Sequence, residues 1–265
     1  MLQIDNYLYA SDLAEAYNTL HSVPGSAVLG GCGYLRLGTR KISTAIDLSR
    51  LDLDFIRETD HVVEIGAMTS LRSIETNPST SSLWSGVLAS ALKNIVGVQL
   101  RACVTIGGTV AGRYPFSDPL TALMALEPKL VFHQHGQVLL DEYLEGKGYK
   151  DVLEKIVIPK DGRLAAFSSV RKIKSDYPVL NVAVSRKNRG YRVVVGCRPG
   201  RALHVPAAAS YLEKHGLDAE TAAEAGRIAS DNLQFGDNPR GSGQYRKAVC
   251  PVLVQRALTE VIHAS

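Results

Sequence analysis

The most informative stretch of this chain is residues 105–118, which read Thr-Ile-Gly-Gly-Thr-Val-Ala-Gly-Arg-Tyr-Pro-Phe-Ser-Asp. Glycine has no side chain that would hold a ligand away from the backbone N–H groups. Gly107-Gly108 therefore predicts a loop that an anionic phosphate can approach closely, although a tight bend would look the same. Asp118 lies directly before Pro119 and is expected to cap a helix that runs to about residue 126.

A second glycine loop, Gly30-Gly31-Cys32-Gly33, follows a predicted strand at residues 27–29. A Rossmann phosphate loop would need a third glycine and a long helix after it. Only Tyr34-Leu35-Arg36-Leu37 separates this loop from Gly38 and a predicted strand at 42–48, so the ordinary dinucleotide fold is rejected. Alone, the loop could be a turn between strands. Together, the two loops predict a shared cradle for one cofactor that bears a diphosphate.

Length and composition are those of a globular protein with a substantial hydrophobic core. The chain has 265 residues, of which 45% are hydrophobic, enough for one large domain or two smaller ones. Its apolar runs are shorter than the roughly 20 residues that span a bilayer, and its first residues lack the basic and then apolar order of a secretion signal. We therefore expect a cytoplasmic protein without membrane insertion.

Charge and cysteine content exclude other classes. Residues 1–132 carry 10 Lys/Arg against 12 Asp/Glu, whereas residues 133–265 carry 20 against 14. This basic excess is modest and lacks interleaved aromatic residues, so no nucleic-acid partner is expected. The four cysteines are Cys32, Cys103, Cys197 and Cys250. They form no Cys-x-x-Cys pair, which argues against a metal site on this chain.

Hydrophobic periodicity predicts an α+β protein. Ser11 or Asp12 is expected to cap a first helix, a longer helix is expected over 83–97, and a hairpin is expected around His135-Gly136. From about residue 164 the pattern changes to that of a small α/β domain. Its expected strands cover 179–186 and 191–197, and its expected helices cover 206–215, 218–234 and 246–263.

Four ordered motifs together resemble a known family, the FAD-binding subunit of molybdenum hydroxylases of the xanthine dehydrogenase and carbon monoxide dehydrogenase type. The motifs are Val28 to Leu35, Ile46 to Leu51, Glu64 to Thr69, and Gln99 to Gly108 with Asp118 after it. The resemblance extends through Gly243 to Leu258 and so covers nearly the whole chain.

The resemblance implies an FAD-binding fold of the PCMH type with two subdomains, at about 1–55 and 56–160. A C-terminal flavoprotein domain would follow at 161–265. It also implies that FAD is held with its diphosphate at the two glycine loops. The implied cofactor-binding residues are Leu29, Gly30, Gly31, Cys32, Gly33, Tyr34, Leu35, Ile95, Thr105, Ile106, Gly107, Gly108, Thr109, Asp118 and Leu153.

The chain departs from the family pattern in several places. Thr109 stands where the family usually has asparagine, Cys32-Gly33 stands where Thr-Asp is common, and Ser168-Ser169 stands where a lysine is frequent. Tyr114 and Phe116 replace small residues, and their rings could shield or gate the flavin.

The resemblance implies an electron-transfer subunit with no catalytic acid or base of its own. In such complexes an iron–sulfur subunit and a molybdenum-cofactor subunit are partners, and FAD passes electrons to NAD⁺ or another acceptor. Two alternatives stay open: a scaffold subunit with weakened or lost FAD binding, and a self-contained flavin oxidoreductase.

Overall fold

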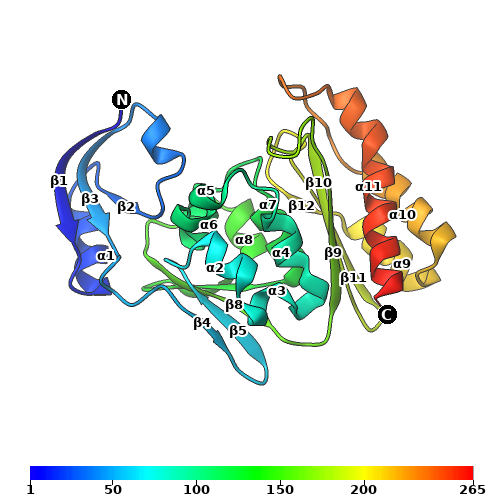
Figure 1. Ribbon diagram of the computed structural model, residues 1–265, viewed down its shortest axis with the longest axis horizontal. Coiled ribbons are helices and arrows are strands. Elements are labelled where there is room, and N and C mark those ends of the chain that lie inside the picture. The colour runs from blue at the N-terminus through cyan, green and yellow to red at the C-terminus, as the bar shows by residue number, and fades with distance from the viewer. Residues whose placement is uncertain (265) are drawn as a thin grey trace. The chain divides into compact units, whose positions relative to one another are not determined.

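The computed structural model describes residues 1–264, which form two compact units that we describe separately (Figure 1). Unit 1 comprises Met1–Ile74, Gly97–Gly112 and Pro128–Ile158, and unit 2 comprises Glu75–Val96, Arg113–Glu127 and the chain from Pro159 onward. Both units mix helices with strands, as expected for an α+β protein. The predicted domain boundary near residue 160 stays a prediction.

The first part of unit 1 is a three-stranded parallel sheet in the order β1-β3-β2. Its strands are β1 (Gln3–Tyr9), β2 (Ala27–Leu29) and β3 (Lys41–Asp47), and α1 (Leu13–Ser22) connects β1 to β2. Asp12 caps α1 by accepting from the N–H of Glu15, so the predicted cap is confirmed. Leu20 of α1 and Ile46 of β3 are buried in one core.

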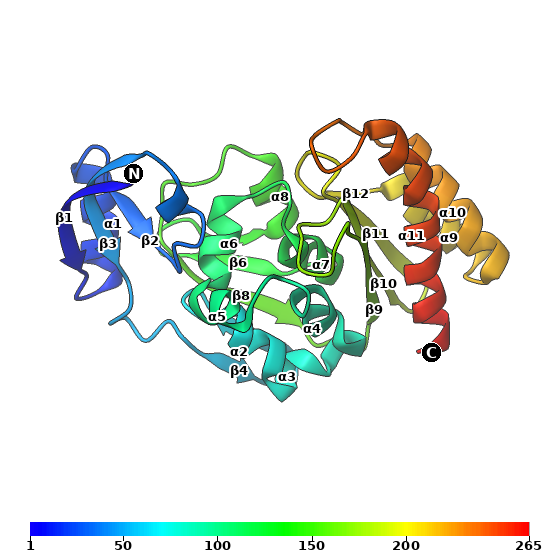
Figure 2. The same ribbon diagram turned by 45° about the horizontal axis from the view of Figure 1, so that its top comes forward.

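The second part of unit 1 is a five-stranded sheet in the order β4-β5-β8-β6-β7. Its strands are β4 (Ile56–Glu58), β5 (Val62–Gly66), β6 (Lys129–Phe132), β7 (Gly136–Leu139) and β8 (Leu153–Pro159). The hairpin of β6 and β7 confirms the one predicted around His135-Gly136. The accompanying helices, seen beside the sheet in Figure 2, are α2 (Leu71–Thr76), α5 (Val98–Cys103), α6 (Ile106–Gly112) and α8 (Leu140–Glu145).

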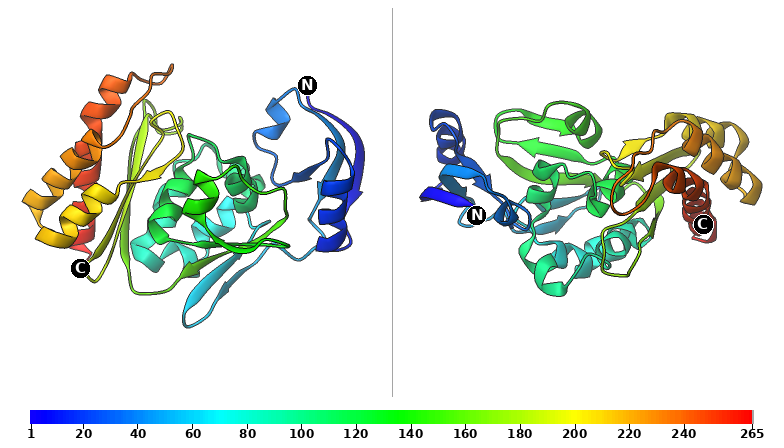
Figure 3. Two further views of the ribbon diagram at one scale, coloured as in Figure 1. Left: turned by 180° about the vertical axis from the view of Figure 1, so that it is seen from behind. Right: turned by 90° about the horizontal axis from the view of Figure 1, so that it is seen from above.

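Unit 2 is built on an antiparallel sheet in the order β12-β11-β10-β9, covered by helices on both faces (Figures 1 and 3). Its strands are β9 (Leu164–Val170), β10 (Leu180–Lys187), β11 (Gly190–Gly196) and β12 (Leu203–His204). One face carries α9 (Pro206–His215), α10 (Ala219–Asp231) and α11 (Gly243–His263). The other carries α4 (Val87–Leu92) and α7 (Asp118–Leu126), and the short α3 (Pro78–Ser81) precedes α4. Alternate valines of β10 and β11 are fully buried, which anchors the main core here.

Two predicted helices differ from the observed ones. Residues 83–97 form a 3₁₀ turn, η2 (Leu83–Gly86), followed by α4 and a bend. Trp84 and Ser85 adopt positive φ angles of 52° and 56°, so the turn winds left-handed and the α-helix begins only at Val87. The predicted cap of α7 was also wrong: Ser117 accepts from the N–H of Leu120, and Asp118 is the first helical residue.

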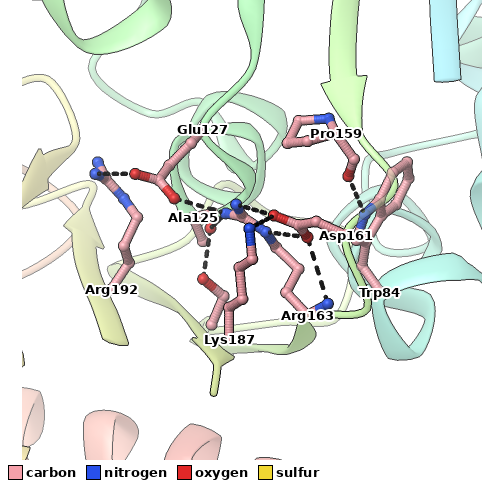
Figure 4. Close-up of polar contacts among 9 residues, drawn as sticks. Trp84, Ala125, Glu127, Pro159, Asp161, Arg163, Lys187 and Arg192 are labelled. Atoms are coloured by element: carbon pink, nitrogen blue, oxygen red, sulfur yellow. Dashed lines mark hydrogen bonds and ion pairs between the residues drawn. The ribbon is translucent and has the colours of Figure 1, made fainter. Parts of the chain in front are cut away.

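Arg163 ties the end of α7 to the strands of unit 2 (Figure 4). Its guanidinium donates to both carboxylate oxygens of Asp161, at 2.9 and 2.7 Å, and to the carbonyl oxygen of Ala125 at 3.2 Å. Glu127 lies 2.9 Å from the same guanidinium. Nearby, the indole of Trp84 donates to the carbonyl oxygen of Pro159 at 2.9 Å. Arg163 is buried at the centre of this cluster while Glu127 is exposed, and all of its residues belong to unit 2.

Candidate cofactor site

The hydroxyl of Thr105 joins the two glycine segments of unit 1. It accepts hydrogen bonds from the N–H of Gly31 at 3.2 Å and from the N–H of Gly108 at 3.1 Å. Residues that lie far apart in the sequence thus meet at one side chain. The structure brings the two predicted glycine segments together.

Three of these glycines are needed because backbone packs on backbone. A Cβ added to Gly31 would lie 1.8 Å from the carbonyl oxygen of Cys103, and one added to Gly30 would lie 2.9 Å from the Cα of Gly108. A Cβ on Gly107 would lie 2.6 Å from the carbonyl oxygen of Ala67. The sequence interpretation assigned the glycines to ligand access. The structure adds that Gly30 and Gly31 allow the two segments to touch, and that Gly107 lets α6 pack on the backbone just after β5.

The first segment has the geometry of an anion-binding turn. Cys32 adopts a left-handed φ of 54°, and its thiol donates to the carbonyl oxygen of Gly30 at 3.0 Å. In the part of the chain that the structure describes, the N–H groups of Cys32 and Gly33 donate to no other protein group. Successive unpaired N–H groups in a left-handed turn form a concavity suited to an anion, so this segment fits a diphosphate.

The second segment is a helix and not the predicted loop. Ile106, Gly107, Gly108 and Thr109 all lie in α6, directly after Thr105. Backbone contacts hold this helix start in place, because Ile106 donates to the carbonyl oxygen of Thr69 and Gly107 to that of Ala67. The Thr109 hydroxyl donates to the carbonyl oxygen of Thr105 at 3.0 Å, which leaves that side chain turned toward its own helix.

Four apolar or aromatic residues of the predicted site also lie in unit 1. Leu29 ends β2, and Leu35 begins the 3₁₀ turn η1 (Leu35–Leu37); both pack against the small core that includes Ala27 and Ala45. Tyr34 directly precedes that turn. Leu153 begins β8 and is buried. Leu29 and Leu35 thus support the first glycine segment from the core side.

Asp118 belongs to unit 2, where its carboxylate is engaged by two side chains. Arg171 donates to one oxygen at 2.5 Å, and Asn181 donates to the other at 2.7 Å. Burial raises the pKa of the Asp118 carboxyl, an effect that Arg171 and Asn181 oppose. The predicted contact of Asp118 with a cofactor hydroxyl stays a prediction.

Ile95 is also in unit 2, half-buried in the bend that follows α4. Tyr114 and Phe116 stack on each other with ring centroids 5.3 Å apart, and Phe116 also contacts Tyr177 at 4.9 Å. The two unusual aromatic residues therefore form one cluster. The gating role inferred for them stays a prediction.

Sequence reasoning missed Arg171 and Asn181 as partners of Asp118. The sequence analysis gave Arg171 no role at the site, yet only 7% of its side chain is exposed. Asn181 is fully buried inside β10 and also accepts from the hydroxyl of Thr121 at 3.0 Å. The one sequence signal for this contact was a polar residue, Asn181, inside the otherwise apolar run 179–184.

Residues 1–264 contain neither a clustered metal site nor a helix that could span a membrane. No group of three or more His, Cys, Asp or Glu side chains gathers as a metal site there. None of the helices formed by these residues combines the length and the hydropathy needed to cross a bilayer.

Comparison with known proteins agrees with this architecture. Residues 2–161 match the family described as the FAD binding domain in molybdopterin dehydrogenase, and residues 165–261 match the CO dehydrogenase flavoprotein C-terminal domain. The fold and the paired glycine segments thus define a flavoprotein component of molybdenum-dependent oxidoreductases. The chain belongs to the family of FAD-binding domains of molybdopterin dehydrogenases, and FAD is the cofactor of that family.

Two relatives match over nearly their full lengths. The chain is 25% identical to the glyceraldehyde dehydrogenase medium chain of Sulfolobus acidocaldarius, with 97% of this chain and 98% of the relative covered. It is 25% identical to the carbon monoxide dehydrogenase medium chain of Hydrogenophaga pseudoflava, with 95% of each covered. The solved carbon monoxide dehydrogenase of Hydrogenophaga pseudoflava superposes with a TM-score of 0.87 at 25% identity, covering 97% of each chain.

Proposed function

We propose that this chain is the FAD-carrying, electron-transferring subunit of a molybdenum-dependent dehydrogenase made of several chains. The observation that carries the proposal is the contact through Thr105, which joins Gly31 to Gly108. Full-length similarity to medium chains of named dehydrogenases supports it.

In this proposal the diphosphate of FAD is held at the turn of Gly30 to Gly33, chiefly by the N–H groups of Cys32 and Gly33. Thr105 fixes that turn by accepting from the N–H of Gly31, and the N–H of Gly108 holds the same hydroxyl in place. Bound FAD supplies redox chemistry, because it accepts electrons singly and releases them in pairs. The chain's own contribution is to bind and orient the cofactor.

The partners that we propose are an iron–sulfur subunit that delivers single electrons and a molybdenum-cofactor subunit that oxidises the substrate. Substrate choice, whether xanthine or another compound, would then lie on the molybdenum subunit. NAD⁺ is one candidate for the final acceptor, and the cytoplasm is the location we predict.

A direct test begins with the purified full-length chain. We expect it to be yellow, or to bind added FAD in equilibrium titration, and to release FAD on denaturation. Native complexes captured through this chain should contain iron, sulfide and molybdenum.

Other outcomes would point elsewhere. A colourless chain that takes up no FAD would favour the scaffold alternative, for which the inward-turned hydroxyl of Thr109 is the supporting observation. NADH oxidation by the isolated chain at the full rate of the complex would favour the self-contained oxidoreductase.

A further inference from the structure

Asp47 is placed beside the first glycine segment by the pairing of the parallel sheet. It is the last residue of the central strand β3, and its cross-strand partners are Leu29 on β2 and Tyr9 on β1. Leu29 directly precedes Gly30. Because the carboxyl ends of parallel strands meet at one edge of the sheet, Asp47 and the glycine turn share that edge.

Two tyrosines of β1 lie on the same face of the sheet as Asp47. Tyr7 and Tyr9 are two residues apart, and side chains two apart on a strand point to the same face. The Tyr7 hydroxyl donates to the Asp47 carboxylate. The Tyr7 and Tyr9 rings meet edge to face at 5.0 Å, and Arg50 lies 4.2 Å from the Tyr9 ring centre. About half of each tyrosine is exposed, so a ligand can reach this group.

Hydrogen bonds from Tyr7 and Ser49 keep the Asp47 carboxylate charged and still leave room for it to accept from a ligand. Burial raises the pKa of its carboxyl, but hydrogen bonds from Tyr7 and Ser49 outweigh burial and the pKa is lowered. The same hydrogen bond raises the pKa of Tyr7, so the phenol stays protonated and acts as donor. A carboxylate has about four acceptor positions. Tyr7, the N–H of Ser49 and the hydroxyl of Ser49 occupy three of them, which leaves one for a ligand hydroxyl.

The hydrogen bond from the Ser49 N–H to Asp47 is typical of a local turn and by itself does not indicate a ligand site. The Tyr7 contact is different, because it fixes the carboxylate from the neighbouring strand at the edge where ligands of parallel sheets bind. A carboxylate repels phosphate but accepts from sugar hydroxyls. In dinucleotide folds an acidic residue about 20 residues after the glycines contacts a ribose hydroxyl. Here a 3₁₀ turn replaces the long helix between glycines and acid, and the end-of-strand position is kept.

We propose that Asp47, oriented by Tyr7, accepts a hydrogen bond from a ribose hydroxyl of the adenosine half of FAD. The inference rests on the proposed function, since it assigns a second contact to the same cofactor. Asp47 thereby becomes a binding residue and Tyr7 a positioning residue.

The test uses the full chain freed of cofactor. FAD, ADP, 2′-deoxy-ADP and 3′-deoxy-ADP are titrated by calorimetry against wild type, Asp47→Asn and Tyr7→Phe. The matched control is Asp5→Asn, an exposed aspartate on β1 that pairs with Lys41. We expect wild type to bind at least one deoxy analogue roughly 10- to 100-fold more weakly than ADP, because a hydrogen bond to a charged acceptor is lost. Asp47→Asn should shrink that difference, Tyr7→Phe should reduce it in part, and Asp5→Asn should preserve it.

Each other outcome decides a separate question. If wild type binds FAD but does not distinguish ADP from either deoxy analogue, the ribose contact is overturned while the proposed function stands. If Asp47→Asn weakens FAD but not ADP, the carboxylate contacts the ribityl chain and the ribose assignment is wrong. If wild type binds no FAD, the proposed function itself fails. Should Asp47→Asn not fold, the wild-type comparison of ADP with its analogues still decides.

Discussion

The guanidinium of Arg171 donates to the carboxylate of Asp118 across 2.5 Å, and both side chains are almost wholly withdrawn from solvent. Asn181 of β10 also donates to this carboxylate and in turn accepts from the hydroxyl of Thr121 on α7. An ion pair in such surroundings is costly to break on one side only, because the remaining charge loses its partner.

Asp118→Ala should therefore destabilise the cofactor-free chain by about 3–5 kcal/mol. Urea unfolding of the apoprotein measures this effect apart from any cofactor contact. Asp60→Asn, at an exposed position, is the control and should stay within about 0.5 kcal/mol of wild type. Equal stability of the two variants would mean that the pair contributes nothing to the fold.

Gly31→Ala should separate the two glycine segments. The new methyl group would lie 1.8 Å from the carbonyl oxygen of Cys103, which is backbone and cannot rotate away. We expect a loss of about 2 kcal/mol or more in unfolding free energy, together with weaker FAD binding.

Gly38→Ala is the matched control for that substitution. Its methyl group would be 3.4 Å from the nearest atom, the carbonyl oxygen of Leu35, so little has to move. If both alanine variants bind FAD as wild type does, the close approach at Gly31 has no role in the site.

Thr105→Val should weaken the same junction through hydrogen bonding. Valine keeps the shape but cannot accept from the N–H groups of Gly31 and Gly108. The expected cost is about 1–3 kcal/mol in stability, and FAD should dissociate faster. Thr105→Ser keeps the hydroxyl and should restore most of the affinity. A valine variant with wild-type dissociation kinetics would show that Thr105 does not position the turn.

Acid should weaken unit 2 through Asp161. Burial alone would raise the pKa of its carboxyl, but hydrogen bonds from Arg163 and Lys187 lower it from 3.8 to about 2. The stabilisation is present above pH 4 and is lost as the pH falls from about 4 to about 2, because in this range the unfolded state takes up a proton that the folded state resists. After solvent screening we expect about 1 kcal/mol.

Asp161→Asn checks this pH dependence. Between about pH 4 and about pH 2, the unfolding free energy of Asp161→Asn should vary less with pH than that of wild type. Asp60→Asn should show the same pH dependence as wild type. An unchanged slope for Asp161→Asn would remove Asp161 from the acid response.

The sequence predicted those elements whose signals are local. Asp12 caps α1 because its side chain reaches an N–H three residues away, and the β6–β7 hairpin follows from a short turn at Gly136. The two glycine segments were also predicted correctly as neighbours, first from the pair of glycine loops and then from a family resemblance.

The remaining features depend on contacts between distant residues. Adjacent glycines are poor helix formers, so Gly107-Gly108 suggested a loop, yet backbone bonds to Ala67 and Thr69 hold them in α6. Asp118 had the sequence context of a cap, and nothing near it in the chain indicated that Arg171 would neutralise it. The left-handed turn at Trp84 likewise interrupts a stretch with helical periodicity.

Trp84 is the only tryptophan of the chain, and it is buried with its indole N–H bound to the carbonyl oxygen of Pro159. Both residues belong to unit 2. Intrinsic indole emission therefore reports on unit 2 alone, whereas far-ultraviolet circular dichroism averages over both units. The protein carries a built-in optical label with which the cooperativity of the two units can be followed without any added probe.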